Sequence, residues 1–236
     1  KADVLKRLLT GPFAHCGIRW GLTGTVPKAD YEFMGLKCSI GDVSNRIQAS
    51  ELQDKGVLAN CHVNVLQTQD HPQFKTYAEE LKWLTTDKTR MKWVANTIQD
   101  ISSSGNTLIL VDRISAGEIL EEQIDDAVFV SGSTKNTDRK EQYDEISTAT
   151  NKVIIATYGV AAVGINIPRI FNLVLIEPGK SFVRVIQSIG RGIRKAEDKD
   201  SVQIWDITSS CKFAKRHLGA RKKFYKEANY PYNIEK

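Results

Sequence analysis

One glutamine and two arginines late in the chain have the spacing of side chains that act together. Gln187, Arg191 and Arg194 stand four and three residues apart in the run Gln-Ser-Ile-Gly-Arg-Gly-Ile-Arg. We predict a helix over Phe182–Arg194, and this spacing then puts the three side chains on one helical face. Two guanidinium groups on one face can reach a single anion, and their bidentate fork suits phosphate oxygens. A surface helix with solvated arginines would give the same pattern, so the motif alone leaves both interpretations open.

A threonine and a glycine-rich segment upstream supply a second set of groups suited to phosphate. Thr157 ends a strand that we predict over Val153–Thr157, and the run Gly164-Ile165-Asn166-Ile167-Pro168 follows it. A strand that ends in this way presents a hydroxyl and backbone N–H groups to a phosphate. The two runs together favour phosphate chemistry over a plain surface helix.

These side chains need a scaffold, and the sequence predicts one from about Leu81 onward, where helical and strand-like segments alternate. The strands are expected over Thr107–Val111, Ala127–Val130, Val153–Thr157, Leu173–Ile176 and Val202–Ile207. The helices are expected over Leu81–Ile101, from Thr137 or Asp138 to Thr148, over Phe182–Arg194 and over Cys211–Ala228. A further helix is expected to begin at Ser115, where Glu118 completes a capping box. This alternation indicates an α/β fold with a parallel sheet and right-handed crossovers. Ligands bind at the carboxyl ends of such strands, which singles out the loops with Arg113, Ser131-Gly132, Thr157 and Glu177-Pro178-Gly179.

Residues 1–70 have a different pattern from the rest of the chain. One strand is expected over Gly17–Leu22, ending in Thr23-Gly24-Thr25, and one helix over Ala49–Lys55, while the remainder up to Leu66 looks irregular. Such elements without a sheet of their own cannot bury enough surface to stand alone. We therefore predict that residues 1–70 are the tail of a preceding domain and that residues 71–236 form the domain with the parallel sheet.

Three of these runs, in this order, resemble the motifs of superfamily 2 helicases and translocases. Thr157–Pro168 resembles motif V, Gln187–Arg194 resembles motif VI, and Thr23-Gly24-Thr25 stands where motif III belongs. The resemblance covers nearly the whole chain and implies RecA-like domains of the P-loop NTPase type, each a parallel sheet between helices. Residues 1–70 would be the end of the first such domain and residues 71–236 the second.

The segment Glu51–Ala59 is similar to the DNA-directed group of that superfamily, which includes XPB-like helicases and restriction-enzyme motors. Within this group it most resembles phage helicases that remodel branched recombination and replication intermediates. The resemblance therefore implies an ATP-dependent DNA helicase or translocase that acts on branched DNA in recombination, replication and repair. ATP with Mg²⁺ would be the cofactor, and DNA and the chain's own upstream RecA-like domain would be the partners. Such a protein would work in the cytoplasm, which is the host's cytoplasm if the protein comes from a phage.

The resemblance also implies a role for each matching residue. Arg191 and Arg194 would reach across the interdomain cleft to the γ-phosphate of ATP, with Gln187 beside them, and neutralise charge in the transition state. Gly164, Asn166 and Gly190 would lie on the nucleotide side of the cleft. The nucleic-acid backbone would be held by Thr157, Arg113, Ser131 and Gly132. The two domains would be coupled by Thr23, Gly24 and Thr25. One position departs from the pattern, because many families carry Asp where Asn166 stands.

Two motifs that such a motor needs are absent from the sequence. There is no G-x-x-x-x-G-K-[ST] and no D-E-x-[HD] to hold magnesium. Gly179-Lys180-Ser181 imitates the end of a phosphate loop, but the position five before Gly179 is Val174, inside a predicted strand. We therefore read Pro178-Gly179 as a turn and expect the true phosphate loop upstream, so that this chain alone should not hydrolyse ATP.

Composition and charge limit which other classes of protein and site the sequence could represent. The four cysteines and four histidines are scattered without metal-ligand spacing, so neither a disulfide framework nor a metal held by the protein alone is expected. The longest apolar runs are too short to span a bilayer. The net charge is +5, and the cations gather near the end of the chain at Lys212, Lys215, Arg216, Arg221, Lys222, Lys223 and Lys226. Lys222 and Lys223 are candidates for DNA contact, although a solvated helix face would look the same.

Three other interpretations differ from a DNA motor. An RNA helicase is possible because backbone contacts to one strand need not distinguish the sugars. A non-catalytic nucleic-acid-binding module would account for the basic C-terminal helix, but it does not require the paired arginines Arg191 and Arg194. A dinucleotide-binding domain is excluded, because no G-x-G-x-x-G follows any strand.

Overall fold

The computed structural model describes residues 2–23, 26, 30–132, 134, 141, 144–145, 148–164, 169–181, 189–190 and 196–235. The chain divides into two compact units, Lys1–Gln48 and Ala49–Lys236. The second unit contains the sheet and most of the predicted site residues.

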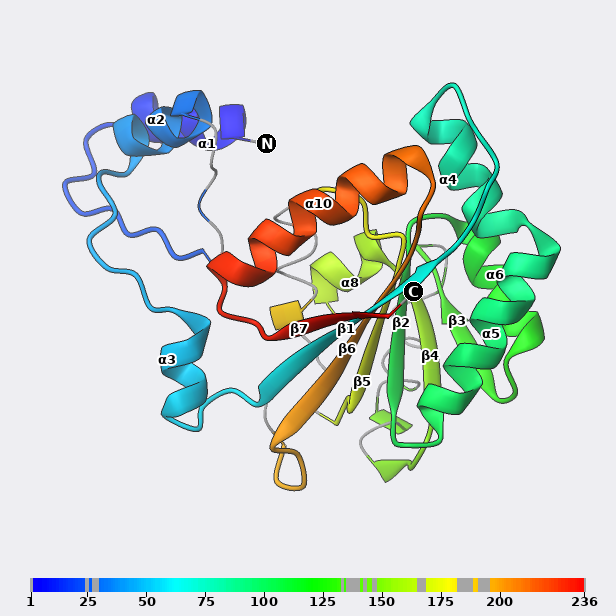
Figure 1. Cartoon of the computed structure of the whole chain (residues 1–236). Coiled ribbons are helices and arrows are strands. Elements are labelled where there is room, and N and C mark those ends of the chain that lie inside the picture. Colours follow the sequence, from blue (N-terminus) through cyan, green and yellow to red (C-terminus); the bar gives the residue numbers. More distant parts are fainter. Residues whose placement is uncertain are drawn as a thin grey trace. The chain divides into compact units, whose positions relative to one another are not determined.

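The second unit is built on a parallel sheet (Figure 1). Its described strands are β1 (Asn60–Thr68), β2 (Thr107–Val111), β3 (Ala127–Val130), β4 (Val153–Thr157), β5 (Asn172–Ile176), β6 (Ser201–Ser209) and β7 (Tyr232–Glu235). They lie in the order β3-β4-β2-β5-β6-β1-β7, and every neighbouring pair is parallel. All residues of β2 and β5 are buried, as the continuous apolar runs predict for strands covered on both faces.

Helices cover both faces of this sheet (Figure 1). The described helices of the unit are α3 (Ala49–Asp54), α4 (Tyr77–Thr86), α5 (Lys88–Ser102), α6 (Ile114–Gln123), α8 (Tyr158–Gly164) and α10 (Lys212–Glu227). One buried cluster joins α5 and α6 to alternate strand residues such as Ile109 and Val174. The other cluster joins α8 and α10 to the intervening residues of the same strands, such as Leu108 and Leu173, whose side chains point to the opposite face of the sheet. The predicted α/β fold with helices on both sides is confirmed.

Two helix predictions in this unit are wrong in detail. The helix expected over Leu81–Ile101 is two helices, α4 and α5. Asp87 separates them, since it ends α4 and its carboxylate accepts the backbone N–H of Arg90 at 2.9 Å to cap α5. The capping box expected at Ser115 is also absent, because α6 already begins at Ile114 with Arg113 at the N-cap position and no side-chain cap.

The predicted boundary at residue 70 differs from the division in the structure. The segment expected to be irregular contains β1, which lies between β6 and β7 inside the sheet. Its core side chains Cys61, Val63 and Val65 are buried, but polar residues stand between them, so the segment has no continuous apolar run. The compact division falls after Gln48 instead.

The first unit contains α1 (Ala2–Thr10) and α2 (Asp30–Ser39). The strand expected over Gly17–Leu22 is wrong, since these residues have no regular secondary structure and no strand is described in this unit to pair with them. Arg19 instead holds the local backbone, donating to the carbonyls of Ala14 at 2.8 Å and Ser39 at 2.9 Å. Within the described parts of the chain, no helix has the length and apolar character needed to cross a membrane.

Candidate functional site

Three neighbouring strands bring predicted nucleic-acid-binding residues to one edge of the sheet. Arg113 lies just beyond the carboxyl end of β2, Ser131 and Gly132 beyond β3, and Thr157 at the end of β4. Because β3, β4 and β2 are adjacent and parallel, these loops lie side by side. The sequence prediction that they share an edge is confirmed.

The polar groups at this edge also form hydrogen bonds that stabilise the loops to which they belong. The guanidinium of Arg113 donates to the carbonyl of Ala78 at 3.4 Å, and the Ser131 N–H donates to the hydroxyl of Thr134 at 3.1 Å. Thr157 is half-buried, and its hydroxyl accepts the N–H of Val160 at 3.4 Å, in the first turn of α8. The edge is therefore a set of turns held by their own hydrogen bonds, in which Ser131 is buried, Arg113 and Thr157 are half-buried and Gly132 is exposed.

The basic C-terminal helix, α10, presents most of its cations on one face. Its buried residues are Ala214, His217, Leu218, Arg221 and Tyr225. The exposed or half-buried cations are Lys212, Lys215, Arg216, Lys222, Lys223 and Lys226, and we call them the basic face. Lys222 and Lys223 lie roughly 15 Å along the helix from its start at the carboxyl edge, so the structure does not bring them to the loops of β2–β4.

Arg221 does not belong to the basic face, contrary to its place in the predicted cluster of cations. Its side chain is 0% exposed and forms a bidentate pair with Asp206, at 2.8 Å from Nε and 2.9 Å from Nη2. The Tyr225 hydroxyl donates to the same carboxylate at 2.8 Å. Charge alone could not separate Arg221 from its neighbours, but its spacing from Leu218 and Tyr225 on the apolar stripe could have done so.

Several predicted site residues lie outside the described residues. These are Gln187, Arg191, Arg194, Asn166, Gly24 and Thr25, together with most of the helices expected at 137–148 and 182–194. Gly164 is the last residue of α8, and Thr23 is exposed in the first unit. Gly190 is helical and exposed, with open space where a side chain would start, while the adjacent Ile189 is fully buried.

The sequence analysis did not predict a buried network of ion pairs and hydrogen bonds at the turn after β5. The Glu177 carboxylate pairs with Arg90 of α5 at 2.8 Å and accepts the Thr208 hydroxyl at 3.1 Å. Burial raises the pKa of Glu177 to about 7, against the opposing attraction of Arg90 and Arg221. The turn was singled out from sequence, but no pattern connected it to an arginine 87 residues away.

The same turn decides the role of Gly179-Lys180-Ser181. Gly179 has a φ of 73°, is buried, and its carbonyl accepts a hydrogen bond from Arg221 at 2.7 Å. Lys180 is exposed and directly follows this tight turn. A phosphate loop would wrap its N–H groups around an anion, whereas the interior of this turn faces a guanidinium. The predicted turn at Pro178-Gly179 is confirmed.

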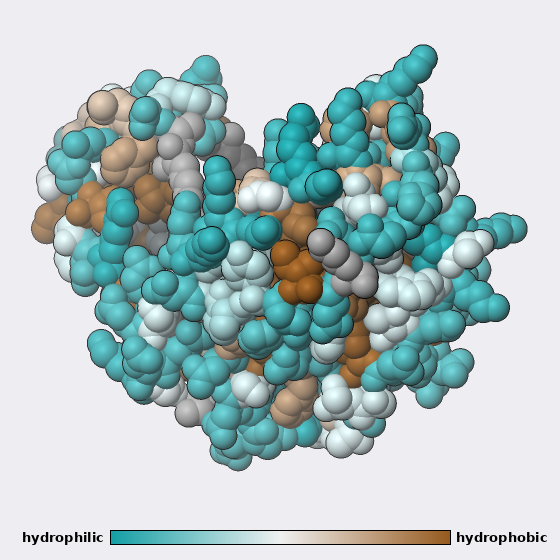
Figure 2. All heavy atoms as spheres, viewed as in Figure 1, coloured by the Kyte–Doolittle hydropathy of each residue, from teal (hydrophilic) through white to brown (hydrophobic). Residues whose placement is uncertain are grey.

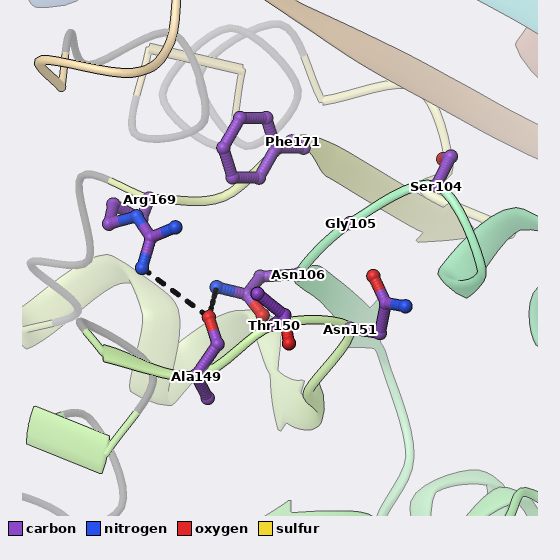
Figure 3. Close-up of a pocket in the computed structure, with 8 residues that line it drawn as sticks. All are labelled: Ser104, Gly105, Asn106, Ala149, Thr150, Asn151, Arg169 and Phe171. Carbon is purple, nitrogen blue, oxygen red and sulfur yellow. Dashed lines mark hydrogen bonds between the residues drawn. The ribbon is translucent and has the colours of Figure 1, made fainter.

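A cavity of about 200 Å³ lies at the opposite edge of the sheet (Figure 3). It is lined by residues that precede β2, β4 and β5, including Asn106, Ala149 and Arg169. The Asn106 amide donates to the Ala149 carbonyl at 3.0 Å, and Arg169 pairs with Asp198 at 2.7 Å. This amino-edge cavity contains none of the predicted site residues. Across the described ranges, no group of three or more His, Cys, Asp or Glu residues is placed to hold a metal.

Comparison with known proteins gives consistent results. Residues 89–196 match the family model described as helicase conserved C-terminal domain. The chain is 26% identical over 227 residues to the ATP-dependent DNA helicase uvsW of Enterobacteria phage T4, a match that covers 92% of this chain and 45% of the helicase. It is 27% identical over 229 residues to a putative helicase of a Sulfolobus islandicus filamentous virus, covering 87% of this chain and 40% of that protein. The chain thus spans less than half the length of these relatives.

Solved structures show the same fold. The crystal structure of T4 UvsW matches with a TM-score of 0.65 and 23% identity, over 75% of this chain and 42% of that chain. Yeast (S. cerevisiae) Dbp5 bound to RNA and ADP BeF3 matches with a TM-score of 0.60 and 16% identity, over 89% of this chain and 50% of that chain. Residues 89–196 thus match the helicase conserved C-terminal domain model, and the chain shares the α/β fold of these two solved structures.

Proposed function

We propose that this chain is the C-terminal motor part of an ATP-dependent DNA helicase or translocase that acts on branched DNA in recombination, replication and repair. The observation that carries the proposal is the alignment of Arg113, Ser131-Gly132 and Thr157 at the carboxyl ends of three adjacent strands, within the helicase-type domain. The likeness to a phage DNA helicase over 92% of the chain supports DNA as the substrate. The site of action would be inside the cell.

In this proposal the active site is divided between two domains. The upstream domain holds the triphosphate and Mg²⁺, and Arg191 and Arg194, with Gln187 beside them, complete the site from this chain. Gly164, Asn166 and Gly190 lie toward the nucleotide. Positively charged groups that meet the γ-phosphate only when the cleft closes stabilise the transition state more than the ground state.

The nucleic-acid grip would combine the carboxyl-edge loops with the basic face of α10. Hydroxyl and backbone groups of Ser131, Gly132 and Thr157 suit phosphate oxygens, and Arg113 adds a guanidinium. Lys222 and Lys223 would contribute attraction from α10. Because phosphate contacts dominate such a grip, binding should depend strongly on salt and only weakly on base sequence.

We also propose that the first unit contains the end of the preceding RecA-like domain, with Thr23-Gly24-Thr25 coupling the two domains. Hydrophobic side chains are visible on this unit in Figure 2. Ile18, Trp20 and Leu22 alternate along the chain and are 83%, 87% and 97% exposed. Large apolar side chains as exposed as these are typical of an interaction surface, which supports a contact with a preceding domain.

The test is ATP hydrolysis by this chain and by the longer natural protein that includes the upstream domain, each with and without branched DNA and RNA. We expect hydrolysis only by the longer form, with stimulation by DNA greater than by RNA. Hydrolysis by this chain alone would contradict the divided site. Greater stimulation by RNA would assign the motor to RNA, and binding without hydrolysis by either form would support a non-catalytic binding module.

A further inference from the structure

Two arginines from opposite faces of the sheet hold the turn that follows β5. Arg90 belongs to α5, on the face covered by α5 and α6, and pairs with Glu177 at 2.8 Å. Arg221 belongs to α10, on the other face, and donates to the Gly179 carbonyl at 2.7 Å. Both guanidinium groups are almost completely buried. The turn is therefore fixed from both sides at positions only two residues apart.

The backbone at this turn has a conformation that requires such support. Glu177 has a φ of 41°, in the left-handed region that side chains other than glycine rarely adopt, and Pro178 follows it. Its N–H donates to the Ile207 carbonyl at 3.0 Å, while its carboxylate is held by Arg90 and Thr208. A strained residue persists only where its surroundings determine its conformation, and such residues gather at functional sites.

Helix α10 contacts the chain before residues 182–188 through Arg221 and shares a buried hydrophobic cluster with Ile189, which follows them. Before that segment, Arg221 holds Gly179. After it, Ile189 is fully buried in the hydrophobic cluster that also contains Leu218 and Tyr225 of α10. The start of α10 is fixed in turn, because the Glu80 carboxylate of α4 accepts the N–H groups of Phe213 at 3.0 Å and Ala214 at 2.7 Å. Arg221, Leu218 and Tyr225 lie on the opposite side of α10 from the basic face.

We propose that Arg221 is a positioning residue that couples nucleic-acid contact at the basic face of α10 to the turn at Glu177–Gly179 and thereby to ATP hydrolysis. The inference rests on the proposed function. Nucleic acid bound to the basic face biases the position of α10, and the Arg221–Gly179 contact transmits this to the chain that leads to the motif-VI-like run. Packed elements transmit small shifts because they have few alternative arrangements.

The decisive variant is Arg221→Lys in the longer natural protein. Lysine keeps a positive charge beside Asp206, but a single ammonium group cannot form the bidentate pair and also reach the Gly179 carbonyl. We expect DNA-stimulated kcat to fall by about tenfold, within the roughly 5–150-fold range typical of coupling between sites. The KM for ATP and the Kd for DNA should stay within about threefold, because a positioning residue touches neither ligand.

Two further variants separate the contact from general stability. Tyr225→Phe removes one hydrogen bond to Asp206 but leaves the Arg221–Gly179 contact, so stimulation should remain at the wild-type level. Arg221→Met combined with Asp206→Asn removes the ion pair without leaving a buried charge, and the amide oxygen introduced at position 206 can still accept from Tyr225. It should reproduce the loss seen in Arg221→Lys. Undiminished stimulation in either Arg221 variant, or an equal loss in Tyr225→Phe, would overturn the proposal.

Hydrogen exchange in the wild-type protein provides a measurement that needs no variant. Binding of DNA should slow exchange at the amides of Gly179, Lys180 and Ser181, and unchanged exchange there would overturn the coupling. The outcomes also separate this inference from the proposed function. A wild-type protein that shows no DNA-stimulated hydrolysis refutes the motor itself, whereas a wild-type motor whose stimulation survives Arg221→Lys refutes only the role of Arg221.

Discussion

Buried polar side chains gather near the turn after β5 at the carboxyl edge of the sheet. They include Glu80, Arg90, Glu177, Asp206, Thr208, His217 and Arg221. A buried charge is tolerated only when it is paired and its remaining groups are hydrogen-bonded. The role of a residue in this network therefore cannot be inferred from its residue type alone. In the sequence Arg221 is one more cation of a basic helix, but in the structure it is buried and bound to Asp206 and Gly179.

At the level of single residues, His217 should make stability depend on pH. Burial, with Arg221, Arg216 and Lys180 nearby, lowers its pKa from 6.5 to about 4. Below pH 6.5 the unfolded chain takes up a proton that the folded chain does not accept until about pH 4. The stabilisation is thus present above pH 6.5 and lost as pH falls toward 4, by at most about 3 kcal/mol.

The measurement is urea unfolding of wild type and His217→Phe between pH 4 and 8. Phenylalanine keeps an aromatic ring against Tyr77, whose ring centroid is 4.7 Å away, but cannot titrate. The difference in unfolding free energy between the two proteins should change across pH 4–6.5 and stay constant above it. A constant difference over the whole range would show that His217 titrates alike in both states.

Arg191 provides the residue-level test of the divided active site. In the longer protein, Arg191→Ala should lower ATP hydrolysis by roughly three orders of magnitude, since an arginine that meets the transferred phosphoryl group acts mainly in the transition state. DNA affinity should change little. The exposed Arg46 gives a matched control, because Arg46→Ala removes the same charge elsewhere. Retained hydrolysis in the Arg191 variant would remove that residue from the active site.

Secondary-structure elements could be predicted where neighbouring residues formed an apolar run or a helical pattern. The strands β2, β3, β4 and β5 and the helix α10 agree with the sequence prediction to within about one residue, because apolar runs and helical periodicity report burial directly. The single helix expected across Asp87 was wrong, since helical periodicity continues through a break of one capping residue. β1 was missed because only continuous apolar runs were read as strands, although the apolar and polar residues of Cys61–Val65 alternate as in a strand with one buried face.

The contact between α6 and β3 allows a prediction at the level of elements. A Cβ at Gly117 of α6 would meet the Phe129 ring of β3 at 2.3 Å, so Gly117→Ala forces the ring to move. Gly219 of α10 has open space at the same point, and Gly219→Ala should stabilise its helix by about 1 kcal/mol. We expect Gly117→Ala to be less stable than Gly219→Ala by roughly 2 kcal/mol in urea unfolding. Equal stabilities would mean that Phe129 relaxes freely.

The basic face of α10 is tested by the salt dependence of DNA binding. Replacing Lys222 and Lys223 by Gln should weaken binding and make the plot of log affinity against log salt less steep by about one to two units. The control replaces Lys82 and Lys92, which are exposed on α4 and α5, and removes the same two charges elsewhere. If both pairs give the same slope, the basic face is only a solvated helix surface.

At the level of the whole molecule, the fold class and the family resemblance could be predicted from sequence, but the extent of the sheet domain could not. Three ordered motifs and a regular alternation of elements predict a RecA-like domain without any knowledge of contacts. The boundary depends on whether Val63 and Val65 have strand partners, and those partners are β6 and β7. The alternation at Cys61–Val65 could have indicated a strand, but it could not show which strands pair with it.

Truncation tests this boundary. A chain that begins at residue 49 retains every strand of the sheet and should unfold cooperatively, with a Tm within a few degrees of the full chain. A chain that begins at residue 71 loses β1 from between β6 and β7. Losing the burial of Cys61, Val63 and Val65 alone removes about 5 kcal/mol, a large part of a typical domain's stability. Equal Tm values for the two truncated chains would show that β1 is dispensable.

The place of β1 in the sheet also has a consequence for how the protein is made. β1 is the first strand of its unit to leave the ribosome, but its neighbours are the last two, and the hydrogen-bonded residues Thr68 and Thr208 are 140 positions apart. The sheet cannot be completed until β6 and β7 have emerged from the ribosome, which happens only after most of the domain has been made. Such non-local pairing makes folding slow, and until it is complete β1 remains an unpaired edge open to aggregation.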